Sequence, residues 1–144
     1  MRTQPFAAVA ALAALATAGC IPPASCTHTN MAAKPVTKVD RPGAATPAVV
    51  EALLTAGSAL DGERIAFELL EDGATLYETS ATTGADGTAR ADLERLGPQA
   101  VTPFRRATQL RATFAGDATY CASADVAPMT FLDTHPVPTE SSAR

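Results

Sequence analysis

The sequence predicts an all-β fold, an antiparallel β-sandwich of about seven strands preceded and followed by disordered segments. Three observations predict it. Short stretches in which apolar and polar residues alternate recur along the chain, and Gly- and Asp-containing turns separate them. Beyond the amino terminus, no segment combines helical caps with a helical period. The 144 residues suffice for one domain with tails.

Residues 1–19 predict a signal peptide. Arg2 gives the positive start, and the apolar run Phe6–Ala16 is too short to span a bilayer. A start of translation at Met31 would instead leave a cytosolic domain. The signal interpretation is favoured because the first twenty residues contain a charged start, an apolar run and small residues before Cys20.

Two cleavage sites follow the apolar run. Thr17-Ala18-Gly19-Cys20 resembles a bacterial lipobox, with Thr17 standing where Leu is usual. This resemblance implies a diacylated Cys20 as the new amino terminus and a protein lipid-anchored to the bacterial membrane. Cleavage after Ala18, at the Ala16-Thr17-Ala18 site, would give a secreted or periplasmic protein instead.

Residues 20–46 are rich in Pro and have few apolar residues at any period, which predicts a linker that holds the domain away from the membrane. The domain is predicted over 47–133, and 134–144 form a polar tail without pattern. The expected strands are 47–55, 63–70, 74–83, 88–93, 109–114 and 123–132.

Within the domain, alternation assigns an inward face to each of four strands. The inward residues are expected to be Val50, Ala52, Leu54, Ile65, Phe67, Leu69, Ala89, Ala91, Leu93, Leu110, Ala112 and Phe114. Asp72-Gly73 predicts a hairpin turn. The Thr-rich segment 74–83 is expected at a sheet edge. Residues 52–60 have some helix propensity, but the Gly62 turn that follows favours a strand. Residues 96–107 are expected to form a loop.

The stretch 109–123 is the most specific part of the sequence. A strand leads into Phe114-Ala115-Gly116-Asp117-Ala118-Thr119-Tyr120, then Cys121-Ala122-Ser123. Gly116, Asp117 and Tyr120 match a motif near the end of bacterial Ig-like repeat domains, which this stretch resembles. With the hairpin Thr82-Thr83-Gly84-Ala85-Asp86-Gly87-Thr88-Ala89, the resemblance covers about residues 46–133. It implies an Ig-like β-sandwich, in a family that serves mostly as spacers, stalks and adhesive modules.

A second resemblance concerns the segment Leu60–Leu69 and the hairpin that follows it. The same pattern occurs in carboxypeptidase-regulatory-like and transthyretin-like domains. The strand order in a structure would distinguish these from an Ig-like sandwich.

Several classes of function are disfavoured by composition. The formal net charge is −4 and the longest basic run is Arg105-Arg106, so no nucleic-acid partner is expected. The two histidines, His28 and His135, lie in the predicted tails, where no scaffold would hold a catalytic base. The chain is therefore expected not to be an enzyme and to need no cofactor.

No metal site is expected either. The loop carboxylates each belong to a Gly-containing turn and lack the spacing of calcium ligands. These are Asp61, Asp72, Asp86 and Asp117.

Three cysteines complete the sequence. If Cys20 is acylated, Cys26 and Cys121 remain, and an exported protein tends to oxidise such thiols. A Cys26–Cys121 disulfide is one interpretation, and a small buried apolar role for Cys121 is the other.

The expected protein is an envelope-anchored Ig-like module with a binding, adhesive or structural spacer role. Its partners would be the membrane, through the lipid anchor, and another envelope protein or a polysaccharide. The alternatives are a carboxypeptidase-regulatory-like or transthyretin-like accessory domain, or a hydrolase of unknown type.

Overall fold

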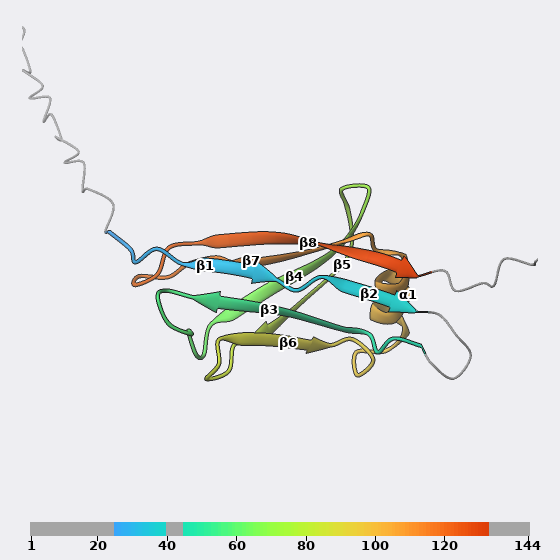
Figure 1. Ribbon diagram of the computed structural model, residues 1–144, viewed down its shortest axis with the longest axis horizontal. Helices are drawn as coiled ribbons and strands as arrows, with labels where there is room; N and C mark the ends of the chain where they lie inside the picture. Colours follow the sequence, from blue (N-terminus) through green and yellow to red (C-terminus); the bar gives the residue numbers. More distant parts are fainter. Residues whose placement is uncertain (1–24, 40–44, 133–144) are drawn as a thin grey trace, which may run out of the picture.

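The computed structural model describes residues 25–39 and 45–132 (Figure 1). Within these ranges, two β-sheets pack face to face, and one short helix covers one end of the sandwich. The elements are β1 Asn30–Ala33, β2 Val36–Val39, β3 Val49–Thr55, β4 Arg64–Glu71, β5 Ala74–Thr82, β6 Thr88–Asp92, α1 Pro98–Arg106, β7 Gln109–Phe114 and β8 Ser123–Leu132. The predicted all-β sandwich is confirmed.

The strand order is that of an immunoglobulin-type sandwich. One sheet has the order β1-β3-β6 and the other β2-β8-β7-β4-β5. In immunoglobulin folds the second strand lies beside the fifth in one sheet, while the third, sixth and seventh form the other. When β1 and β2 together are counted as the first strand, β3 is the second strand and lies beside β6, the fifth. The third, sixth and seventh strands are then β4, β7 and β8, which lie in the other sheet. The sheets are antiparallel except at β2, which pairs in parallel with β8.

The core lies between the two sheets and consists of the residues that alternation placed inward. All twelve residues predicted to face inward are buried. Val50, Ala52 and Leu54 come from β3, and the other nine come from β4, β6 with the adjoining Leu93, and β7. The Thr-rich β5 ends the five-stranded sheet, as predicted. Burial of one face of each strand is what holds the two sheets together.

Two turns have the backbone that their residues predicted. Asp72 and Gly73 both have positive φ angles, 51° and 81°, as the β4–β5 hairpin requires. Gly116 has a φ of 79°, and a Cβ there would lie 2.7 Å from the Ala122 amide nitrogen. Position 116 therefore admits only glycine without rearrangement of the turn.

The predicted linker is wrong for residues 30–33 and 36–39, which form β1 and β2. Each strand has only four residues, too few for a recognisable alternation. Their partners lie far away in the sequence, on β3 and β8. Pro35 lies between them, where the chain leaves one sheet and enters the other. Proline has no N–H to donate, and at this position the sheets need none.

The predicted loop 96–107 is also wrong, because Pro98–Arg106 form α1. The prolines that suggested a loop are compatible with this helix, since Pro98 occupies its first turn, where no N–H is needed. Ala100 and Phe104, four residues apart, are buried on its inner side.

Candidate functional site

The structure joins the amino-terminal segment to the β7–β8 connection by a disulfide. Cys26 and Cys121 are bonded, with their Cα atoms 5.0 Å apart and 95 positions apart in the sequence. Main-chain hydrogen bonds run beside the disulfide, from Thr27 N to Thr119 O (2.7 Å) and from Cys121 N to Thr27 O (2.9 Å). We call residues 26–29 and 119–123 together the amino-terminal clasp.

Thr29 continues the clasp toward the interior. Its side chain is buried, and its hydroxyl donates to the Cys121 carbonyl oxygen (2.8 Å) and shares a hydrogen bond with the Ser123 hydroxyl (2.7 Å). Further along, the Ala33 amide donates to Asp125 Oδ2 (2.9 Å). These bonds attach the edge of β1 to β8 of the opposite sheet and satisfy groups that β1 cannot pair within its own sheet.

Gly116, Asp117 and Tyr120 shape the turn that supports the clasp. Asp117 Oδ1 accepts hydrogen bonds from the amides of Thr119 and Tyr120, each at 2.7 Å. Tyr120 is partly buried against the core. Gly116, Asp117 and Tyr120 therefore have structural roles here, and they place Cys121 opposite Cys26.

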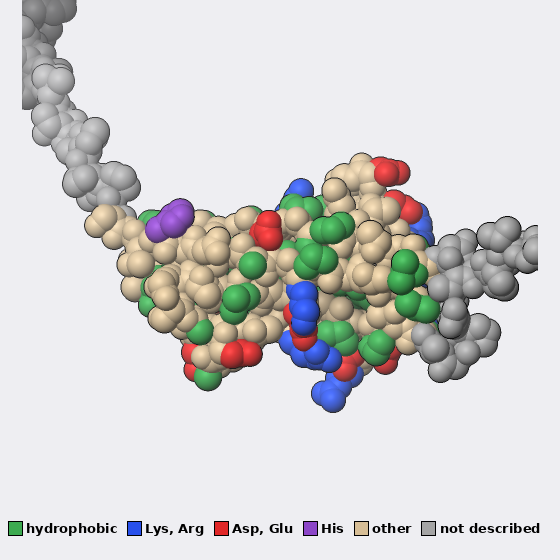
Figure 2. Space-filling model, viewed as in Figure 1, with side chains coloured by type: hydrophobic (Ala, Val, Ile, Leu, Met, Phe, Trp, Pro, Cys, Tyr) green, Lys and Arg blue, Asp and Glu red, His purple; other side chains and the backbone are tan. Residues whose placement is uncertain are grey.

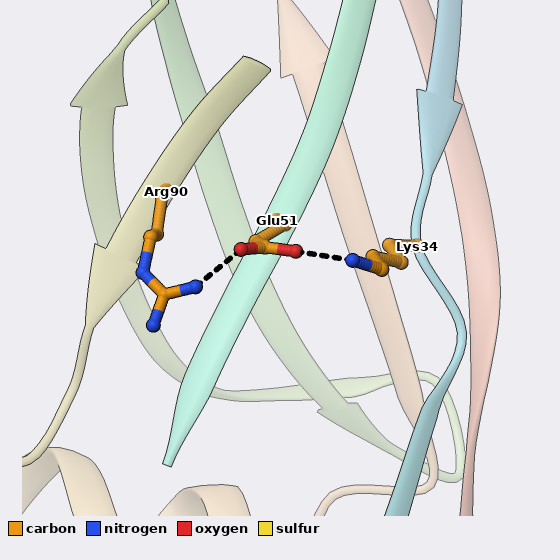
Figure 3. Close-up of polar contacts among 3 residues, drawn as sticks. All are labelled: Lys34, Glu51 and Arg90. Atoms are coloured by element: carbon orange, nitrogen blue, oxygen red, sulfur yellow. Dashed lines mark hydrogen bonds and ion pairs between the residues drawn. The ribbon is translucent and has the colours of Figure 1, made fainter. Parts of the chain in front are cut away.

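A charged cluster lies on the outer face of the three-stranded sheet (Figure 3). Lys34 Nζ lies 2.6 Å from Glu51 Oε2, and Arg90 bonds Glu51 Oε1 from the other side. Hydrogen bonding from Lys34, assisted by Arg90, lowers the pKa of Glu51. Two cations thus share one carboxylate, which we call the Lys34–Glu51–Arg90 cluster. Figure 2 shows Lys and Arg side chains gathered at the centre and lower centre of the face in view.

Shallow depressions flank this cluster. One is lined by Pro35, Val36 and Pro47, and the other by Ala32, Leu53 and Thr88. The cluster has cationic donors and an exposed rim but no nucleophile beside a base. Its chemistry suits polar contact with a partner better than bond cleavage.

Lys38 of β2 is buried beneath α1, an arrangement that the sequence did not predict. Its ammonium donates to the carbonyl oxygens of Phe104 (3.2 Å), Arg105 (3.0 Å) and Ala107 (2.5 Å). The rings of Phe104 and Phe131 lie 5.9 and 5.3 Å away. Burial lowers the pKa of Lys38, and the carboxylate of Glu71 opposes that shift. The ammonium caps the carboxyl end of α1, where the helix dipole favours a cation.

The remaining predicted positions do not converge. Asp61, Asp72, Asp86 and Asp117 lie in four separate turns. In the part of the chain that the structure describes, no group of three or more His, Cys, Asp or Glu side chains could hold a metal ion. Cys20 and His135 lie outside the described residues, and His28 is exposed. No helix within 25–39 and 45–132 is long and apolar enough to cross a membrane.

The chain was compared with protein-family models, with curated proteins and with solved structures, and none of the three comparisons found a match.

Proposed function

We propose that the protein is an exported, lipid-anchored, Ig-like module of the bacterial envelope, with a binding, adhesive or spacer role. The Cys26–Cys121 disulfide is the observation that carries this proposal. Disulfides persist in oxidising compartments outside the cytoplasm and are rare inside it. The signal-like residues 1–19 and the lipobox-like Cys20 supply the route and the anchor.

Because of the clasp, the module is expected to lie closer to the membrane than the predicted linker implies. The described fold already includes Cys26, β1 and β2, which precede the predicted domain boundary of residue 47. Only residues 21–25 would separate it from a lipidated Cys20, a reach of about 20 Å at full extension. The module would therefore stand next to the membrane surface, with its amino-terminal end facing the lipid.

Binding is favoured over catalysis by the arrangement of polar side chains. Glu51 is held between Lys34 and Arg90, and Glu68 pairs with Arg111, so these carboxylates are engaged in ion pairs. The Lys34–Glu51–Arg90 cluster, with the shallow depressions beside it, offers a charged surface to an envelope protein or polysaccharide. The immunoglobulin-type strand order supports the Ig-like resemblance over the transthyretin-like one.

The anchor can be tested by fractionation. The full chain, expressed in a bacterium, should partition into detergent, whereas Cys20→Ala should become soluble or stay unprocessed. Attachment should depend on the lipid, since a chain with net charge −4 is not attracted to anionic lipid. Thr17→Leu, which completes the lipobox, is the matched control and should partition like the wild type. A wild-type protein found entirely in the aqueous phase would contradict the proposal.

A further inference from the structure

We infer that the Cys26–Cys121 disulfide and strand β8 together form a covalent strap that makes the module inextensible between its two ends. This would give the protein a load-bearing function, and it rests on the proposed function because the load would enter through the anchored amino terminus.

The strap follows the shortest covalent path through the module. From the amino-terminal side, that path reaches Cys26, crosses the disulfide to Cys121 and continues directly into β8, Ser123–Leu132. Figure 1 shows that the described chain begins at one end of the long axis and that β8 finishes at the other. The path therefore runs along the whole module and bypasses everything between the two cysteines.

Very little of this path can lengthen. β8 is a strand of ten residues, and a strand already rises about 3.4 Å per residue against a maximum of about 3.6 Å. Tension applied to the two ends of the strap would extend it by only a few Å. Peeling β8 away would gain no length, because both of its ends already lie on the path.

The same tension has a different consequence when the disulfide is reduced. Tension then enters at Thr27 and must pass through the chain between the cysteines, which are 95 positions apart. Only hydrogen bonds, such as those between Thr27 and the Thr119–Cys121 segment, would resist it at the clasp. Unfolding would release about 340 Å of chain at full extension. The oxidation state of one bond thus separates a rigid tether from an extensible one.

Single-molecule pulling tests this directly. The full chain would carry Cys20→Ala, which leaves only the paired cysteines, with one attachment tag inserted after Pro23 and another after Arg144. The oxidised protein should show no unfolding step up to the force at which the attachments fail. After reduction, or in the Cys26→Ser/Cys121→Ser variant, a step of about 340 Å should appear. The inference is overturned if the oxidised protein shows the same long step.

A second attachment geometry provides the control. Moving the carboxyl-terminal tag into the β4–β5 turn, between Asp72 and Gly73, places the load across the folded strands. The oxidised protein should then unfold with a clear step, which shows that the strap protects one direction only. Absence of a step in that geometry too would mean general resistance to force and would contradict the strap. No lipid enters either measurement, so a failure of the anchor would be seen separately, by fractionation.

Discussion

Lys38 is a buried polar residue whose side chain holds the end of α1. It is buried, and its ammonium satisfies three carbonyl oxygens at the end of α1. Lys38→Met should leave those carbonyls without a donor and lower the free energy of unfolding by about 1–3 kcal/mol. Chemical denaturation would measure the change.

Lys34→Met is the matched control for this substitution. The Lys34 side chain is 68% exposed and its ion pair is screened by solvent, so the loss should stay below about 1 kcal/mol. Equal losses for the two variants would show that the Lys38 ammonium does not stabilise α1.

Glu51 predicts a dependence of stability on pH. Lys34 and Arg90 lower the pKa of this carboxyl from its ordinary value of 4.5. A lowered carboxyl pKa gives stability that is complete above the ordinary value and is lost as the pH falls through the lowered one. Glu51→Gln should therefore cost about 0.5–1 kcal/mol at neutral pH and progressively less in acid.

Denaturation curves of wild type and Glu51→Gln between neutral pH and pH 3 would measure this difference. A cost of Glu51→Gln that is constant down to the lowest pH would contradict the assigned pKa shift.

At the residue scale, the sequence predicted the core because burial repeats every second residue along a strand. The sequence did not predict the burial of Lys38, because the helix that covers this side chain begins sixty residues later and leaves no signal among its neighbours. It left the cysteine pairing open for the same reason, since the contact between Cys26 and Cys121 depends on the whole fold.

At the scale of elements, β1 and β2 are strands that local sequence patterns do not predict. Both are short, and β2 pairs with β8, about ninety positions away in the sequence. Their burial comes from these distant partners, so a window of neighbouring residues contains little of the signal. The helix α1 was missed because Gly97 and two prolines are equally typical of a loop.

A truncation tests whether these strands belong to the fold. A chain that begins at Pro47 would lack β1, β2, the disulfide and the hydrogen bonds of the clasp. β3 would lose its pairing with β1, and β8 would lose its pairing with β2. Met129, which is buried opposite Val36 of β2, would become more exposed. We expect this chain not to fold, as judged by circular dichroism and thermal unfolding.

A chain that begins at Ala24 keeps both strands and the disulfide and should unfold cooperatively. If the chain from Pro47 instead melts at the same temperature as the chain from Ala24, residues 24–46 contribute nothing to the fold and the original linker prediction would be restored.

At the scale of the whole molecule, the sandwich and its order place the two ends of the described chain at opposite ends of the long axis (Figure 1). The sequence could predict this class of fold, because spaced turns and alternating strands are typical of a sandwich. The clasp could be seen only in three dimensions. Because the clasp includes Cys26, only a few residues separate the domain from its proposed lipid anchor at Cys20.

We propose that the processed protein is a lipid-anchored module closed by its disulfide. Intact-mass analysis of the protein purified from the bacterial envelope tests both parts in one measurement. We predict a chain that begins at a diacylglyceryl Cys20 and gains mass on reduction and thiol alkylation at Cys26 and Cys121 alone. An unmodified chain that begins at Gly19, with thiols that react before reduction, would contradict it.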